Sequence, residues 1–189
     1  IHGFSCSGEF FAQNSGWHRV GEERSALVVY PTAYPYYTKP DINSKSPMRT
    51  GIATPHWNSG SLHAKGLDAE GPDDVDFIRQ MLEDVMSKYP IDPERVYVTG
   101  HSNGSMMTQL IMRKMPEKFA GFAPVGAMEC RLAKTEAPTD GIKRNVWYTM
   151  GEFDGLGCSL EGENANTRTL SMICEANGID VTKQKHYTT

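Results

Sequence analysis

The sequence lacks the cysteine patterns by which metal and redox proteins are recognised. Its 189 residues contain four cysteines, Cys6, Cys130, Cys158 and Cys174, and no two of them form a CxxC pair. A zinc ribbon and a dithiol redox motif are therefore not predicted, and we expect no metal site and no cofactor. Disulfides and reduced buried thiols both fit the even count, with Cys158 and Cys174 the pair nearest in sequence.

The sequence also lacks a basic cluster and a long apolar run. Its net charge is −4, and Lys and Arg are scattered along the chain, so nothing indicates binding to nucleic acid or to an anionic membrane. The longest apolar runs, residues 26–30 and 121–128, have the length of strands and are too short to span a bilayer. We expect a soluble protein, and the sequence does not indicate its oligomeric state.

An initiating methionine and a signal peptide are absent as well. Residues 1–3 begin where a strand would end, so we expect the chain to be a piece of a longer one. A length of 189 residues suits one domain, and no break in composition divides it. We therefore expect one domain over residues 1–189.

Helical and extended patterns alternate along the chain. Helices are predicted over residues 73–89, 103–114 and 164–177, and a helix broken near Ser15 and Gly16 is predicted over residues 9–23. Strands are predicted over residues 26–30, 96–98, 119–125 and 145–150, and another extended segment is predicted to begin at residue 181. This alternation predicts a doubly wound α/β domain with a parallel sheet.

The most informative stretch is GHSNG at residues 100–104, which lies between a β-branched run and a helix-forming segment. A strand, a sharp turn and a helix with a serine at the apex are typical of a nucleophile elbow, so Ser102 is the predicted nucleophile. Side chains at positions 100 and 104 would collide in this strained turn, which explains the two glycines. An ordinary glycine-lined turn is the alternative, because the spacing alone recurs by chance; the flanking elements favour the catalytic interpretation.

Acyl transfer also needs two hydrogen-bond donors for the negative charge that develops on the substrate oxygen. One is predicted to be the backbone N–H of Asn103, which follows the nucleophile at the N-terminus of a helix. The other is expected from an N-terminal loop that opens with His-Gly, and here it is the N–H of Phe4.

A serine nucleophile further requires a base and an acid, in the chain order serine, acid, histidine. Asp154 is the predicted acid, because it follows a strand in a glycine-flanked loop at the sheet edge where ligands bind. Glu152 and a purely structural turn are the alternatives.

The base is harder to place. His186 is the only histidine after Asp154, but it lies in an alternating segment that is typical of an exposed strand. His101 is adjacent to Ser102 and is expected to point away from it, and the other histidines come too early in the chain. We therefore expect the general base beyond residue 189.

Residues 31–71 form a long excursion that is rich in Pro, Tyr, Ser, Asn and Gly and has no clear period. Its aromatic residues fit two interpretations: they form the wall of a substrate cleft, or they anchor the excursion to the body of the domain. Trp57 is the candidate for a substrate-binding wall residue.

Taken together, these stretches resemble a known family. His2-Gly3, DDVDFI at residues 73–78, YPIDPERVYV at 89–98, GHSNG at 100–104, FAGFAPV at 119–125 and MGEFD at 150–154 resemble the polyhydroxybutyrate depolymerase and feruloyl esterase family of α/β-hydrolases. The resemblance covers nearly the whole chain and is most specific over residues 73–125. It implies an α/β-hydrolase fold, a mostly parallel sheet with helices on both faces, without the family's N-terminal strands and C-terminal histidine segment.

The resemblance implies a serine carboxylic-ester hydrolase with Ser102 as nucleophile and Asp154 as acid. The implied substrates are feruloyl or acetyl esters of plant polysaccharide, or polyhydroxyalkanoate esters, and the implied location is extracellular. The alternatives are a catalytically silent module of the same fold that binds polysaccharide or polymer, and an inactive piece of an active enzyme.

Overall fold

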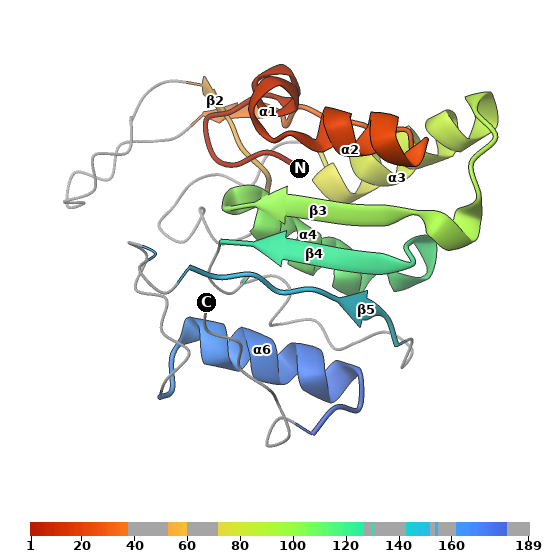
Figure 1. Ribbon diagram of the computed structural model, residues 1–189. Coiled ribbons are helices and arrows are strands. Elements are labelled where there is room, and N and C mark those ends of the chain that lie inside the picture. Colours follow the sequence, from red (N-terminus) through yellow and green to blue (C-terminus); the bar gives the residue numbers. More distant parts are fainter. Residues whose placement is uncertain are drawn as a thin grey trace.

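The β-prone runs on either side of the predicted elbow form the centre of the molecule. The computed structural model describes residues 1–37, 53–59, 72–126, 130, 143–151, 154 and 162–180. Within them, strands β3 (Tyr97–His101), β4 (Gly121–Val125) and β5 (Asn145–Val146) form a parallel sheet in that order (Figure 1). A bridge between Val125 and Thr149 extends the β4–β5 pairing. The strands predicted around residues 96–98, 119–125 and 145–150 are thus confirmed, with shifted ends.

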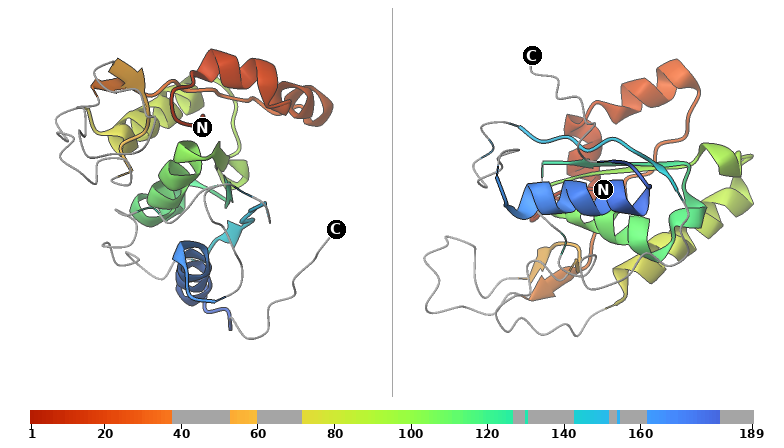
Figure 2. Two further views of the ribbon diagram at one scale, coloured as in Figure 1. Left: turned by 90° about the vertical axis from the view of Figure 1, so that its left-hand side faces the viewer. Right: turned by 90° about the horizontal axis from the view of Figure 1, so that it is seen from below.

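Parallel strands need a crossover, and helices provide it. Helix α4 (Asn103–Lys114) connects β3 to β4 and packs on one face of the sheet, next to α3 (Asp74–Lys88). Figure 2 shows α2 (Trp17–Arg24) on the opposite side of the sheet, and α6 (Ala165–Ala176) beyond the β5 edge. The predicted α/β fold with helices on both faces is therefore confirmed.

The helix ends follow from local sequence chemistry. Asp73 caps α3 by accepting hydrogen bonds from the N–H groups of Val75 and Asp76. Asn164 and Thr167 form a capping box at α6, whose C-terminal end is followed by Gly178 at φ 64°. Gly16, at φ 73°, separates α1 (Gly8–Asn14) from α2, as predicted for the broken helix.

The hydrophobic core lies between α4 and the sheet. Alternate residues of β3 point to this side, and Val98 is buried there. Helix α4 is buried on all sides from Asn103 to Ile111, and its Met106, Met107 and Ile111 belong to the core cluster. The helical segment that follows the elbow is therefore surrounded by packed protein.

Two expectations about the first half of the chain were incomplete or wrong. Residues 26–30 pair with no strand in the described part of the chain, and Leu27 and Val29 are 50% and 41% exposed. Strand propensity favours an extended backbone, but a strand also needs a partner. The antiparallel pair β1 (Pro35–Tyr37) and β2 (Ala53–Pro55) was not predicted, because the long excursion has no alternating pattern.

The free edge of β3 is occupied by the first residue of the chain. The backbone N–H of His101 donates to the carbonyl of Ile1 at 3.1 Å, and the Ile1 nitrogen donates to the carbonyl of Thr99 at 2.8 Å. These two bonds flank Gly100 and hold the N-terminal segment beside the elbow. Residues 181–189, predicted as extended, lie outside the described residues.

His2 is completely buried next to this edge. Its Nδ1 donates to the carbonyl of Gly3 at 2.7 Å, and its Nε2 accepts the N–H of Ala33 at 2.9 Å. These bonds define the neutral tautomer, because the Ala33 N–H needs an unprotonated Nε2. Burial lowers the pKa of His2, since it disfavours the charged imidazolium.

None of the described helices combines the length and the apolarity that crossing a bilayer requires.

Replacing Ile111 by Ala tests the packing of α4 against the sheet. Ile111 is fully buried, so the cavity left behind should lower the free energy of unfolding by about 2–5 kcal/mol. Ile179→Ala is the matched control, because Ile179 is 54% exposed and should change stability by less than about 1 kcal/mol. Urea denaturation measures both, and equal losses in the two variants would contradict the assigned core.

The burial of His2 predicts a pH dependence of stability. As the pH falls past its ordinary pKa of 6.5, the imidazole binds a proton more readily in the unfolded chain than in the folded one, because burial lowers the pKa of His2 in the folded state. The unfolded state then holds more protons, so the free energy of unfolding should fall as the pH drops below that value. Urea unfolding at about pH 7.5 and about pH 5.5 should show a smaller loss in His2→Gln than in the wild type. His18→Gln, at an exposed position, should keep the wild-type loss; the same loss in His2→Gln would refute the prediction.

Candidate active site

The elbow has the backbone that a nucleophilic serine requires. Ser102 stands between β3 and α4 with φ 55° and ψ −119°, a conformation that side chains rarely adopt. A Cβ at Gly100 would overlap the carbonyl oxygen of Gly104, and a Cβ at Gly104 would overlap the carbonyl oxygens of Ile1 and His2. Both glycines are therefore sterically required, Gly100 by the turn itself and Gly104 by the N-terminal segment.

The Ser102 backbone is fixed by hydrogen bonds on both sides. Its N–H donates to the carbonyl of Val125 at 3.0 Å, and its carbonyl accepts the N–H groups of Ser105 and Met106 at 2.8 Å and 3.1 Å. Its side chain makes no capping hydrogen bond to α4 and is only partly buried. The hydroxyl is thus not used to cap the helix, although Ser102 occupies the N-cap position.

The N-terminal loop lies against the serine. A Cβ on Gly3 would stand 3.4 Å from Cβ of Ser102, so the loop approaches the nucleophile closely. The loop then turns through Ser5, at φ 54°, whose N–H donates to the carbonyl of Pro55 at 3.0 Å. Within the described part of the chain the Phe4 N–H has no hydrogen-bond acceptor. The predicted oxyanion donors, Asn103 N–H and Phe4 N–H, therefore belong to two backbone segments that meet at Ser102.

The predicted acid lies at the same edge of the sheet. Gly126 follows β4 with φ 59°, and a Cβ there would stand 3.6 Å from Oδ2 of Asp154 and 3.4 Å from Nε2 of His101. Asp154 follows β5, and its N–H donates to the carbonyl of Gly151 at 3.1 Å. The carboxyl ends of β3, β4 and β5 thus bring Ser102, Gly126 and Asp154 together. Glu152, the alternative acid, lies outside the described residues.

Among the described histidines, His101 alone lies beside the elbow and the acid loop. Its ring lies between Gly3 and Gly126, on an exposed position next to Asp154. The His2 and His56 rings are buried, and Nδ1 of His18 lies 3.2 Å from the carbonyl of Ala12. His63 and His186 lie outside the described residues. The assignment of the general base therefore stays a prediction.

Trp57 is completely buried. Its indole ring lies 5.1 Å from the His2 ring and stacks on Phe77 at 6.4 Å, and its Nε1 donates to the carbonyl of His2 at 3.0 Å. Because the whole side chain is buried and its N–H is bonded, the structure favours the anchoring interpretation of this tryptophan over the cleft-wall interpretation. No sequence pattern indicates these partners, because His2 and Phe77 lie 55 and 20 positions away from Trp57.

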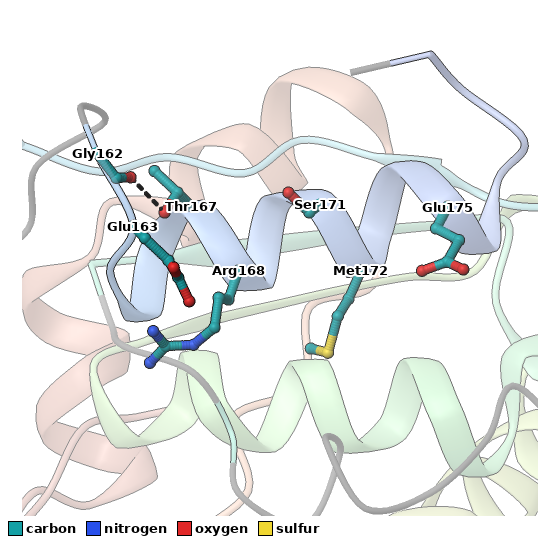
Figure 3. Close-up of a pocket in the computed structure, with 7 residues that line it drawn as sticks. All are labelled: Gly162, Glu163, Thr167, Arg168, Ser171, Met172 and Glu175. Carbon is teal, nitrogen blue, oxygen red and sulfur yellow. Dashed lines mark hydrogen bonds between the residues drawn. The ribbon is translucent and has the colours of Figure 1, made fainter. Parts of the chain in front are cut away.

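A shallow hollow elsewhere involves none of these residues. It is lined by residues of α6 and of the turn before it, namely Gly162, Glu163, Thr167, Arg168, Ser171, Met172 and Glu175 (Figure 3). It has charges of both signs and holds no predicted nucleophile, acid or oxyanion donor. In the described part of the chain no three His, Cys, Asp or Glu side chains gather as metal ligands would.

The chain is similar to several known proteins. The family model described as "Prolyl oligopeptidase family" matches residues 59–182. The chain is 28% identical over 141 residues to poly(3-hydroxyalkanoate) depolymerase C of Paucimonas lemoignei, covering 74% of this chain and 30% of the depolymerase. It is 38% identical over 135 residues to an acetylxylan esterase of Coprinopsis cinerea, covering 69% of this chain and 31% of the esterase. The chain thus spans about a third of the length of these curated relatives.

A solved structure shows the same fold. The Bacillus cereus carboxylesterase superposes with a TM-score of 0.61 at 14% identity, covering 94% of this chain and 72% of that one. The resemblance to α/β-hydrolase esterases that the sequence motifs carry is confirmed by these matches. The chain belongs to the prolyl oligopeptidase family and has the α/β-hydrolase fold.

Proposed function

We propose that this chain carries the nucleophile, the acid and the oxyanion hole of a serine carboxylic-ester hydrolase. The observation that carries the proposal is the backbone of Ser102, held at φ 55° and ψ −119° where β3 meets α4, with Asp154 at the same sheet edge. A strained conformation persists only where the surroundings impose it, and here they present a serine side chain at a helix N-terminus.

The mechanism is acyl transfer through a covalent intermediate. The Ser102 hydroxyl attacks the ester carbonyl, and the N–H groups of Asn103 and Phe4 stabilise the oxyanion of the tetrahedral intermediate. The base takes the serine proton and gives it to the leaving alcohol. The same base then takes a proton from a water molecule that attacks the acyl-enzyme, and returns it to the Ser102 oxygen as the carboxylic acid product leaves. Asp154 orients the base and stabilises its charged form. In this proposal the base is a histidine that follows Asp154 in the chain, and His186 is the candidate within this sequence.

The substrate class is proposed from the relatives and from the sequence resemblance. One matched relative is a poly(3-hydroxyalkanoate) depolymerase and another is an acetylxylan esterase. We therefore propose acetyl or feruloyl esters of plant polysaccharide, or polyhydroxyalkanoate esters, as substrates of an extracellular enzyme. A catalytically silent module that binds such polymers is the alternative, and the test of Ser102 separates the two.

Labelling with a fluorophosphonate probe tests the nucleophile in the protein that contains this chain. We expect covalent labelling at Ser102, its loss in Ser102→Ala, and loss of ester turnover in the same variant. Ser171→Ala is the matched control, because Ser171 is exposed on α6, and it should label and turn over ester like the wild type. A folded wild-type protein without labelling or ester turnover would favour the silent module.

Replacing Asp154 by Asn tests the acid. The amide keeps the size of the side chain but cannot stabilise a charged base, so kcat should fall by about 10⁴-fold with little change in KM. Asp84→Asn is the control, since Asp84 is paired with Lys88 in an exposed ion pair on α3 and should have no effect on turnover. Steady-state kinetics on a soluble aryl ester measures both, and unchanged turnover in Asp154→Asn would place the acid elsewhere.

A further inference from the structure

The side chain of Asn103 makes a paired contact with the backbone of the long excursion. Its Oδ1 accepts the N–H of Trp57 at 2.6 Å, and its Nδ2 donates to the carbonyl of Trp57 at 3.1 Å. Both residues are at most 2% exposed. The amide thus satisfies both backbone groups of one residue, as a neighbouring strand would, at a site shielded from solvent.

The same tryptophan also holds the N-terminal loop. Its indole N–H donates to the carbonyl of His2 at 3.0 Å. Two positions earlier, the carbonyl of Pro55 accepts the N–H of Ser5 at 3.0 Å, and the ring of His56 lies 5.3 Å from the ring of Phe4. Residues 55–57 therefore bind the loop on both sides of Phe4 and bind the first residue of α4.

These contacts join the two backbone segments that carry the oxyanion donors. One donor is the N–H of Asn103, and the other is the N–H of Phe4, between His2 and Ser5. The segments are about one hundred positions apart in sequence, and the absence of a side chain at Gly104 lets them touch. Since an oxyanion hole acts only when both donors point to one oxygen, the distance between these segments must be fixed.

We propose that Trp57 and Asn103 are positioning residues that set the geometry of the oxyanion hole. The proposal rests on the proposed function, because it concerns the donors of that site. The Asn103 amide fixes Trp57 relative to α4, and the Trp57 indole fixes the His2 carbonyl and thereby the loop that presents Phe4. Neither side chain touches the substrate. The donors are thus preorganised through buried hydrogen bonds, before the ester binds.

Trp57→Phe removes the indole N–H and keeps an aromatic ring in the buried site. We expect kcat to fall by about 10-fold to 100-fold with KM changed by less than about 2-fold, because misplaced donors weaken transition-state binding more than substrate binding. Asn103→Ala removes the paired contact while keeping its backbone N–H, and it should lower kcat by a similar factor. Trp147→Phe is the matched control, since Trp147 is 76% exposed, and it should leave both constants unchanged.

An inhibition constant separates positioning from a merely structural role. An alkylboronic acid forms a tetrahedral adduct with the serine, so its affinity should fall by the same factor as kcat, whereas a competitive alcohol product should bind as before. The melting temperatures of the variants identify any that fail to fold. If Asn103→Ala fails to fold, the milder variant Trp57→Phe provides the test of the positioning role.

The outcomes distinguish this proposal from the function on which it rests. A folded wild-type protein without ester turnover would contradict both the proposed esterase function and the positioning role. An active wild type whose folded Trp57→Phe variant keeps its kcat and boronate affinity would overturn the positioning role alone. Equal losses of boronate and product affinity would also overturn it, because they would indicate general damage to the site.

Discussion

The backbone of Ser102 is the constraint on which the rest of the described structure depends. Holding a serine at φ 55° costs on the order of 1–3 kcal/mol, so the surroundings must supply that energy. The parallel pairing of β3 with β4 supplies part of it, because the Ser102 N–H donates to Val125 at the end of β4. The rest comes from α4, whose first nine residues are all buried. A helix packed on every side cannot shift to relax the turn that precedes it.

Two polar side chains buried beside this turn, those of Asn103 and His2, have hydrogen-bond partners, which is why their burial can be tolerated. Asn103 bonds both backbone groups of Trp57, and His2 uses both ring nitrogens. The long excursion is also bound to Asp74. Oδ2 of Asp74 accepts hydrogen bonds from the N–H of Asn58 at 2.6 Å and from the Tyr36 hydroxyl at 3.2 Å. Burial raises the pKa of Asp74, and these two hydrogen bonds oppose that shift because they favour the carboxylate. Residues 57 and 58 are thereby tied to the starts of two helices, α4 and α3.

The parts of the fold that could be predicted from sequence are those that local chemistry determines. Asp73 and Asn164 mark helix starts because their side chains accept nearby N–H groups, and Gly16 marks a break because it adopts a left-handed conformation. The strand predicted over residues 26–30 was wrong because strand formation depends on a pairing partner, and residue propensity does not identify that partner. The Asn103–Trp57 pair could not be found, since its members are 46 positions apart and an amide has no periodic signal.

The separation of the proposed triad members follows from the strand order. Ser102 ends β3, Asp154 follows β5, and β4 lies between them. Neighbouring strands are about 4.8 Å apart, so the backbones of β3 and β5, which lie on either side of β4, are about 10 Å apart. In the proposed mechanism an imidazole must occupy the space between them, above the end of β4. Gly126 stands at that end, and a Cβ there would come within 3.6 Å of Asp154 Oδ2. A side chain at position 126 would therefore crowd both the Asp154 carboxylate and the His101 ring, so the glycine at the end of the middle strand leaves the acid loop room at this edge of the sheet.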